Sequence, residues 1–342
     1  MTVKSWDFYL PDELNASYPP EKRGLRRDHV RIMVLNRHTG ETKHDCFFQL
    51  TEYLQPGDLL ILNNSRTIPA VLQAEWCRNG KLLAEKVEVR LARRLQEDIW
   101  EALIAANPIT IGDTLRFAPE LSASVLAEKE NSPLKMIHFS KKGTELFNMI
   151  YALGEPIRYE YIVEPWALDY YQTVFASHPG SVEMPSAGRA FSWELLFKLN
   201  RKGIQVEFIQ LHTGLSYLLD DQWHQSPEEN DEEYHISEKT LKLIRQTKAS
   251  GKRVIAVGTT VVRALETAAK YCAPSGVTNL YIDRHFPLKI ADGIITGFHE
   301  PKASHLDMLT AFISEHDLLK AYDQAIKSGY LWHEFGDMNL IL

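Results

Sequence analysis

The chain has 342 residues, of which 44% are hydrophobic and 24% charged, and its net charge is -7 at neutral pH. These values are typical of a globular protein with one large and one smaller domain, and the negative charge argues against a surface that coats nucleic acid broadly. The three cysteines, Cys46, Cys77 and Cys272, lie far apart, which excludes a disulfide framework and a cysteine zinc site. The first residues lack the apolar core of a signal peptide and no apolar run is long enough for a membrane span, so we expect a cytoplasmic protein without membrane contact.

The first part of the chain has the pattern of extended structure. Residues 31–35 form an apolar run closed by turn residues, and residues 59–62 form a second run of strand length that we expect to be buried on both faces. From about residue 68, short strands at 86–91, 99–104 and 111–117 follow one another with glycine and proline between them. This spacing predicts a small antiparallel barrel or sandwich.

A helix is predicted at 144–153, with Leu146, Ile150 and Leu153 on one face and Gly154 as its stop. Beyond it, helices alternate with strands. Ser192 and Ser237 are predicted N-caps of two helices, each followed by a glycine and a strand, at 204–209 and 254–257. Further helices are expected at 304–314 and 317–328 and a last strand at 339–342.

Alternating helices and strands favour a mostly parallel α/β layer. We therefore predict a mixed α/β (α+β) fold with two parts. A barrel-like α/β main domain is built from residues 1–65 and 154–342, and a small antiparallel β-barrel domain is inserted at 66–153.

The turn after residues 254–257 is the first candidate site. A buried strand there ends in Gly258 and feeds a helix, so free backbone N–H groups and a positive helix end lie at the carboxyl edge of the sheet. Thr259 or Thr260 is expected to cap this helix, and Arg263 shares a face with Glu266. The turn either holds a phosphate, carboxylate or ribose oxygen, or is a capped core helix with a surface ion pair.

Other polar segments leave the same choice open. Residues 63–66, with Asn63 and Arg66, are either a turn or a site at the end of a strand. Residues 26–28 are either a surface ion pair or part of a site. The acidic run 220–233 is either a solvated loop or a lid. His299 and His305 resemble part of a zinc site, but H-E-x-x-H is absent and no metal is expected. The glycine spacing excludes both G-x-G-x-x-G and the P-loop.

Together, the motifs are similar in kind and order to those of one family, the S-adenosylmethionine:tRNA ribosyltransferase-isomerases of the queuosine pathway. The resemblance covers essentially the whole chain, and several motifs together are more specific than any one of them. The segments that carry it are residues 63–70, 171–174, 179–182, 185–188 and 254–260 with Arg263 and Glu266, then residues 298–299, 301–302 and 336–337.

The resemblance implies an α/β barrel-like main domain with an inserted β-barrel. It also implies S-adenosylmethionine as co-substrate, no metal, and transfer of its ribosyl part to 7-aminomethyl-7-deazaguanine in the tRNA anticodon, with adenine and methionine leaving. The partner would be the anticodon loop, which needs only a local basic patch, and the protein a monomer or homodimer. His212, His299 and Asp337 are the catalytic candidates. Asn63, Arg66, Thr259, Thr260 and Arg263 are the candidates for binding.

Several motif positions differ from the family pattern. Ala190 stands where the family has histidine, Val71 where it has arginine, and Asp231 and Glu232 where it has histidine and serine. Each change removes a proton carrier or an anion ligand, or adds an acid next to a groove for RNA. Two alternatives therefore stay open beside the family reaction: a paralogue that uses another acceptor, and a non-catalytic member that binds a nucleoside or RNA.

Overall fold

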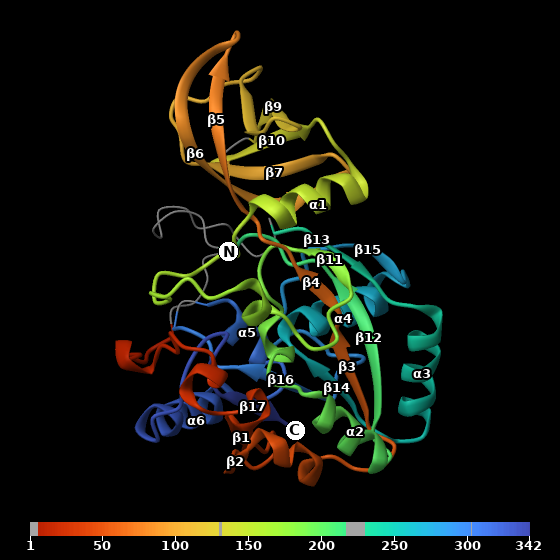
Figure 1. The fold of residues 1–342 in the computed structure, drawn as a ribbon. Coiled ribbons are helices and arrows are strands. Elements are labelled where there is room, and N and C mark those ends of the chain that lie inside the picture. The colour runs from red at the N-terminus through yellow and green to blue at the C-terminus, as the bar shows by residue number, and fades with distance from the viewer. Residues whose placement is uncertain (1–5, 130–131, 217–229, 302) are drawn as a thin grey trace.

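The structure is a computed structural model and describes residues 6–129, 132–216, 230–301 and 303–342. Nine strands form one mixed sheet in the order β15-β13-β12-β3-β14-β16-β17-β1-β2. Figure 1 shows this sheet at one end of the molecule and a separate β-barrel at the other. The strands of the sheet are β1 (Arg31–Leu35), β2 (Thr42–Cys46), β3 (Leu59–Asn63), β12 (Gln205–Leu211), β13 (Glu232–His235), β14 (Val254–Val257), β15 (Ser275–Thr278), β16 (Gly293–Gly297) and β17 (Met338–Ile341).

The sheet contains two blocks of parallel strands that run in opposite directions. In the first block, β12, β3, β14 and β16 are parallel to one another. In the second block, β17 and β1 are parallel to each other, but β17 is antiparallel to β16, with Ile295 opposite Leu340. The expected mostly parallel sheet is thus found only within these blocks, because β17 begins at the edge where β16 ends and because β2, β13 and β15 add antiparallel pairs.

Both faces of the sheet are buried. Along β3, Leu59 and Ile61 belong to one hydrophobic cluster, whereas Leu60 and Leu62 belong to another on the opposite face. This alternation confirms the prediction that residues 59–62 are covered on both sides. The helices of the main part are α2 (Trp193–Arg201), α3 (Glu238–Ala249), α4 (Thr259–Tyr271), α5 (His305–Leu309) and α6 (Glu315–Lys327).

Helix starts were predicted better than helix lengths. Ser192 and Ser237 cap α2 and α3 as predicted, each accepting a hydrogen bond from the backbone N–H three residues on. The helix expected at 304–314 is shorter, because the backbone N–H groups of residues 310–312 bond three residues back and tighten the chain into turns. Among the described residues, no helix is long and apolar enough to cross a membrane.

Six antiparallel strands close the barrel, in the order β10-β7-β6-β5-β8-β9. Its core contains Trp100 and is covered by α1 (Gly143–Leu153), whose Leu146 and Ile150 are buried. Leu153, predicted on the same face, is 39% exposed, because it lies in the last turn of the helix. The strands are β5 (Val71–Arg78), β6 (Lys81–Arg94), β7 (Ile99–Ile104), β8 (Thr114–Ala118), β9 (Leu121–Glu128) and β10 (Leu134–Phe139).

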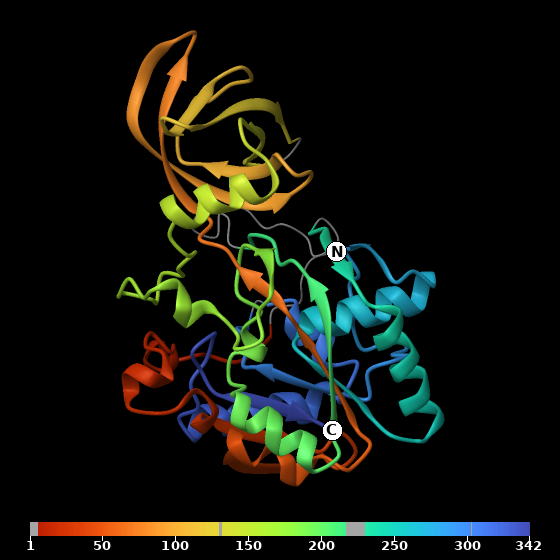
Figure 2. The same cartoon turned by 45° about the vertical axis from the view of Figure 1, so that its right-hand side comes forward.

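The mixed α/β class and the antiparallel barrel are confirmed. The strand expected at 111–117 begins three residues later, because residues 111–113 form a turn. In the described part of the chain, closed hydrogen bonding is confined to the six-stranded barrel, and the nine-stranded sheet ends in β15 and β2. The chain leaves the sheet through β4 (Ser65–Thr67), which pairs with β11 (His178–Ser181) between the sheet and the barrel (Figure 2). The remaining elements are 3₁₀ helices at Asp12–Leu14, Pro20–Arg23, Arg27–His29, Phe47–Tyr53, Leu168–Tyr171 and Ser186–Gly188.

Candidate functional site

Most of the side chains singled out from the sequence lie along one edge of the nine-stranded sheet. The four strands of the first block all end at this edge, and β17 begins there, since Met338 pairs with Gly297, the last residue of β16. We call it the carboxyl edge of the first block; it lies toward the barrel (Figures 1 and 2). Open α/β sheets usually bind ligands at such an edge. The predicted residues found there are Asn63, His212, Thr259, Thr260, His299 and Asp337.

His212 is part of a chain of buried hydrogen bonds. Its Nδ1 lies 2.7 Å from Ser65 Oγ, which in turn lies 2.6 Å from Ser181 Oγ. Its Nε2 lies 2.6 Å from the side-chain nitrogen of Gln210, which can only donate. Burial, with Arg94 nearby, lowers the pKa of His212 to about 4, so the ring is neutral at neutral pH. Nδ1 then carries the proton and donates to Ser65.

Two neighbours fix the position of His212. Gly180 has a φ of +156°, and a Cβ atom at this residue would lie 2.5 Å from His212 Nδ1. The imidazole therefore packs directly on the backbone. Asn63 uses its whole amide to join β3 to β12: Nδ2 donates to the Leu211 carbonyl at 2.8 Å, and Oδ1 accepts from Leu211 N at 3.1 Å and Ser65 N at 3.0 Å. Asn63 thus holds the edge together.

Helix α4 presents free backbone N–H groups at the edge. The predicted cap by Thr259 or Thr260 is wrong: Gly258 is the N-cap residue and no side chain caps the helix. Gly258 has a φ of 97°, which favours glycine. In the described part of the chain, the N–H groups of Thr259 and Thr260 have no acceptor. The positive end of a 13-residue helix is therefore available for an anionic or polar oxygen.

His299 follows β16, and its ring contacts a hydroxyl and a second imidazole. Its Nε2 lies 2.9 Å from Thr296 Oγ1, and its ring stacks on His305 with centroids 4.8 Å apart. Its carbonyl accepts a hydrogen bond from the Trp332 indole. Burial, with His305 and His333 nearby, holds the pKa of His299 well below its usual range. The ring is a neutral hydrogen-bonding group at neutral pH.

Asp337 is a buried hydrogen-bond acceptor within the fold. Its Oδ1 accepts from Arg31 N at 2.8 Å, and its Oδ2 accepts from Arg31 Nη2 at 2.9 Å and Leu331 N at 2.8 Å. Only 4% of the residue is exposed. These bonds tie β17 to the start of β1, so the geometry favours a structural role over the catalytic role expected from the sequence.

Arg263 and Glu266 also have structural partners, and the ion pair considered between them is absent. Arg263 pairs with the buried Glu232 and donates to the backbone carbonyls of Asn230 and Thr278. Glu266 accepts the three backbone N–H groups of residues 289–291. Arg66, by contrast, is exposed, and its guanidinium lies 5.3 Å from the ring centre of Tyr151 on α1. Arg66 is therefore an exposed cation between the carboxyl edge of the first block and the barrel.

Sequence reasoning missed an aromatic stack with two carboxylates. Tyr159 and Tyr161 stack with centroids 5.7 Å apart, and Tyr161 stacks on His333 at 4.2 Å. The Tyr159 hydroxyl donates to Glu183 at 2.7 Å, and the Tyr161 hydroxyl donates to Glu334. These residues come from distant segments without ligand spacing. Their only local signal is that 333–334 precede the motif at 336–337.

Glu334 has an unusual ionisation equilibrium. Burial is the main cause that raises its pKa to about 7, and Glu183 adds to it, although the Tyr161 hydroxyl opposes the shift. A carboxyl group that titrates near neutral pH can both take up and release a proton under working conditions. Perturbed groups of this kind are common in active sites, which makes Glu334 the strongest proton-transfer candidate at this edge.

The motif position occupied by Ala190 in place of histidine is buried and apolar. Ala190 is 5% exposed and belongs to the same hydrophobic cluster as Phe191. The adjacent Arg189 is 2% exposed, and it pairs with Glu21 at 2.8 Å and donates to the Tyr170 carbonyl. A buried cation therefore lies next to the position where the family carries an imidazole. In the nearby segment 26–28, Arg26 forms an ion pair with Asp28. The Asp28 side chain is buried, whereas that of Arg26 is exposed.

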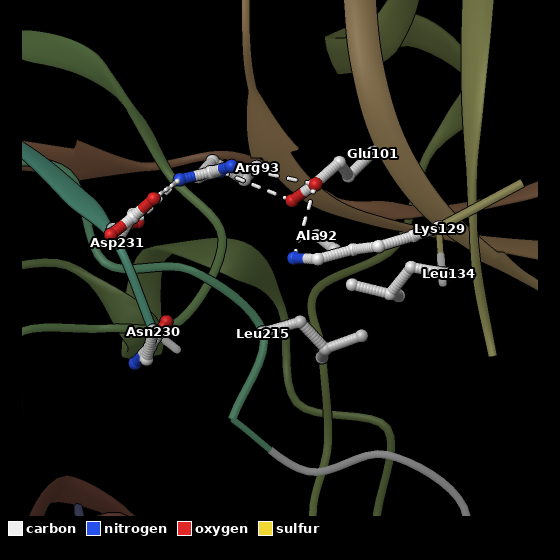
Figure 3. Close-up of a pocket in the computed structure, with 8 residues that line it drawn as sticks. All are labelled: Ala92, Arg93, Glu101, Lys129, Leu134, Leu215, Asn230 and Asp231. Atoms are coloured by element: carbon white, nitrogen blue, oxygen red, sulfur yellow. Dashed lines mark hydrogen bonds and ion pairs between the residues drawn. The ribbon is translucent and has the colours of Figure 1, made fainter. Parts of the chain in front are cut away.

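The acidic residues after position 229 are neutralised by arginines. Asp231 lies 3.0 Å from Arg93 of the barrel (Figure 3). Glu233 lies 3.3 Å from Arg94. The neighbouring cavity, lined by Arg93 and Glu101, measures about 10 Å³, enough for one water molecule. These acids thus connect β13 to the barrel instead of forming a solvated loop. Residues 220–229 of the predicted acidic loop or lid lie outside the described residues.

Comparisons with known proteins agree with this architecture. A family model described as queuosine biosynthesis protein matches residues 3–341. The chain is 39% identical to a protein of Aquifex aeolicus and 38% identical to one of Carboxydothermus hydrogenoformans, both named S-adenosylmethionine:tRNA ribosyltransferase-isomerase, with all of each chain covered. A crystal structure of S-adenosylmethionine tRNA ribosyltransferase from Thermotoga maritima is 32% identical, with a TM-score of 0.57, and covers 99% of this chain and all of that one.

A mixed sheet with polar side chains along one carboxyl edge and a closed β-barrel beside it defines a class of two-part α/β proteins. Within that class, the chain belongs to the queuosine biosynthesis protein family. The resemblance drawn from the motifs is thereby confirmed, and so is the enzyme class, since the relatives are named as transferases and isomerases.

Proposed function

We propose that the protein is an S-adenosylmethionine:tRNA ribosyltransferase-isomerase that acts at the carboxyl edge of the first block. The ribosyl part of S-adenosylmethionine would be transferred to 7-aminomethyl-7-deazaguanine in a tRNA anticodon and isomerised, which gives epoxyqueuosine. The observation that carries the proposal is the convergence of polar side chains and a free helix N-terminus at this edge, in a chain that matches the family over its full length.

The residues at the edge fit S-adenosylmethionine in two respects. When bound, this co-substrate supplies the ribosyl group and an adenine leaving group. Its sulfonium is a cation, which suits the ring of Tyr159 and the carboxylate of Glu183. Its carboxylate or ribose oxygens suit the free N–H groups of Thr259 and Thr260.

Proton transfer is assigned to Glu334, with the histidines in supporting roles. Glu334 holds a proton on Oε1 or Oε2 near neutral pH and shares a hydrogen bond with the Tyr161 hydroxyl. His212 and His299 remain neutral at neutral pH. The His212 ring is hydrogen-bonded to Ser65, and the His299 ring is hydrogen-bonded to Thr296. These two rings therefore hold the neighbouring hydroxyl groups of the edge in position, whereas Glu334 exchanges the proton that the reaction requires.

Arg66 is assigned to the RNA. It is exposed between the carboxyl edge and the barrel, and no described carboxylate pairs with it. Sequence-specific RNA recognition uses splayed bases and a local cation, so the net charge of -7 does not oppose this contact. Replacing Arg66 by alanine should weaken anticodon-loop binding and reduce its salt dependence by about one phosphate contact.

Mass spectrometry of the RNA product tests the reaction directly. An anticodon stem-loop that carries 7-aminomethyl-7-deazaguanine is incubated with the protein and S-adenosylmethionine, and the Aquifex aeolicus relative serves as positive control. A mass gain equal to the epoxycyclopentanediol group, with adenine released in equal amount, is the expected result. No gain in a buffer where the relative is active would contradict the proposal.

A second candidate function is the same transfer to a different acceptor. The observation that favours it is Ala190, which is buried and apolar where the family has a histidine. The same assay separates the two candidates. Adenine released without a mass gain on the RNA, and only when a small-molecule acceptor is added, would support the second.

A further inference from the structure

A second and larger cavity lies at the other edge of the nine-stranded sheet. It measures about 680 Å³, which is within the range of roughly 300–1,000 Å³ typical of small-molecule sites. Its apolar lining comes from Val34 and Leu35 of β1 and from Leu342 after β17. Its charged lining consists of five cations and two carboxylates, namely Arg37, Lys43, Lys248, Lys252 and Arg253 with Glu41 and Asp292.

The topology of the sheet explains why a site can form here. The strands β1 and β17 are parallel to each other and run opposite to the first block, so their carboxyl ends point to this edge. The boundary between β16 and β17 is the point where strand direction reverses. Ligands of open α/β sheets bind outside the carboxyl ends of strands. Each block thus has its own carboxyl edge, and the cavity lies at that of the second, at the end of the molecule far from the barrel (Figure 1).

The cavity has cations without carboxylate partners. Lys248 pairs with Asp292 at 2.6 Å, and Arg253 pairs with the buried Asp58. In contrast, Arg37, Lys43 and Lys252 form no ion pair with any carboxylate of the described residues. Arg37 is also held in place, because it donates to the Asp292 carbonyl at 2.8 Å. In a chain of net charge -7, three such cations around one cavity attract an anion.

An aromatic ring completes the lining. Tyr53 lines the cavity, and its hydroxyl donates to Asp45 at 2.8 Å, which fixes the ring. A fixed ring beside apolar side chains suits the flat face of a base, whereas guanidinium and ammonium groups suit phosphate. We propose that this cavity is a second ligand site, which binds the phosphate group of a nucleotide, either free or as part of an RNA backbone.

The full-length protein is titrated with AMP, with inorganic phosphate and with an unmodified RNA stem-loop, each at two salt concentrations. The variant is Lys43→Ala/Lys252→Ala, and the matched control is Lys81→Ala, an exposed lysine of the barrel. Loss of two charge-assisted hydrogen bonds should weaken binding by at least about tenfold in the double variant, with no change in the control. Thermal unfolding checks that the double variant folds.

A footprint on the wild-type protein keeps the test independent of that variant. AMP is expected to slow acylation of Lys43 and Lys252, but not of Lys81, as measured by mass spectrometry of peptides. No S-adenosylmethionine or modified RNA is needed, so the result does not depend on the proposed reaction.

The three ligands separate the possible outcomes. Weaker binding of AMP and phosphate in the double variant would assign the site to a free nucleotide, and weaker binding of the stem-loop alone, with a smaller salt slope, would assign it to the RNA backbone. Equal binding of all three ligands by the double variant and Lys81→Ala, or acylation of Lys43 and Lys252 that is slowed neither by AMP nor by the stem-loop, would overturn the proposal.

Discussion

Replacing Glu334 by glutamine should change how the stability of the protein depends on pH. The pKa of Glu334 is raised from its usual value of 4.5 to about 7, mainly by burial. Between these values the unfolded chain releases the proton and the folded protein keeps it. The unfolding free energy therefore falls as the pH rises through this window, and one pKa unit corresponds to about 1.4 kcal/mol. The shift amounts to about 3 kcal/mol.

Chemical denaturation of the wild type and the Glu334→Gln variant at about pH 4 and about pH 8 measures this change in unfolding free energy. The wild type should lose about 3 kcal/mol more than the variant between the two conditions, because glutamine does not titrate. Glu120→Gln, an exposed position in the barrel, is the matched control and should behave as the wild type. A parallel loss in the wild type and the Glu334→Gln variant would refute the reasoning.

Further predictions concern the packing and ionisation of His212 and the buried ion pair of Arg263. Gly180→Ala places a methyl group 2.5 Å from His212 Nδ1, so unfolding free energy should fall by about 1–3 kcal/mol and turnover should fall more than KM rises; unchanged kinetics would contradict the packing. Arg263→Ala leaves Glu232 buried without its cation, which should cost about 3–5 kcal/mol in urea denaturation, and adding Glu232→Gln should recover part of the loss. His212 has its pKa lowered from 6.5 to about 4, so its contribution to stability should fall as the pH falls through that window, and His212→Asn should remove this dependence.

The sequence predicted elements whose causes are local. Ser192 and Ser237 cap their helices because a hydroxyl reaches the N–H three residues on, and residues 99–104 form β7 with the predicted bounds. The reversal at β17 was not predictable, because strand direction depends on pairing between segments about 40 residues apart. Thr259 failed as a cap for a related reason: Gly258 takes the backbone conformation that starts the helix.

In the candidate site, too, residues within local motifs were predicted, whereas contacts between distant segments were not. His212 and His299 were candidates because of the family resemblance, and the structure places each of them after a strand, at one edge of the sheet. Their hydrogen-bond partners were not found, since Ser65 and Ser181 are brought to His212 from segments far away in sequence. Glu334 gave no signal beyond its position before the motif at 336–337, because its raised pKa arises from burial and the hydrogen bond to Tyr161 spans 173 positions.

The barrel joins the rest of the protein at a closely tied pair of chain segments. Val71 and Glu155 exchange two backbone hydrogen bonds of 2.9 Å, and Gly154 packs so closely on the Pro69 carbonyl that a Cβ atom there would lie 2.1 Å from it. The inserted segment between Val71 and Glu155 is therefore a loop whose two ends are held together by these backbone contacts. Loop-closure entropy grows only with the logarithm of loop length, so the length of the inserted segment has little effect on the stability of the sheet. A change in the length of the inserted segment should therefore leave the order of the strands that carry the candidate site unchanged.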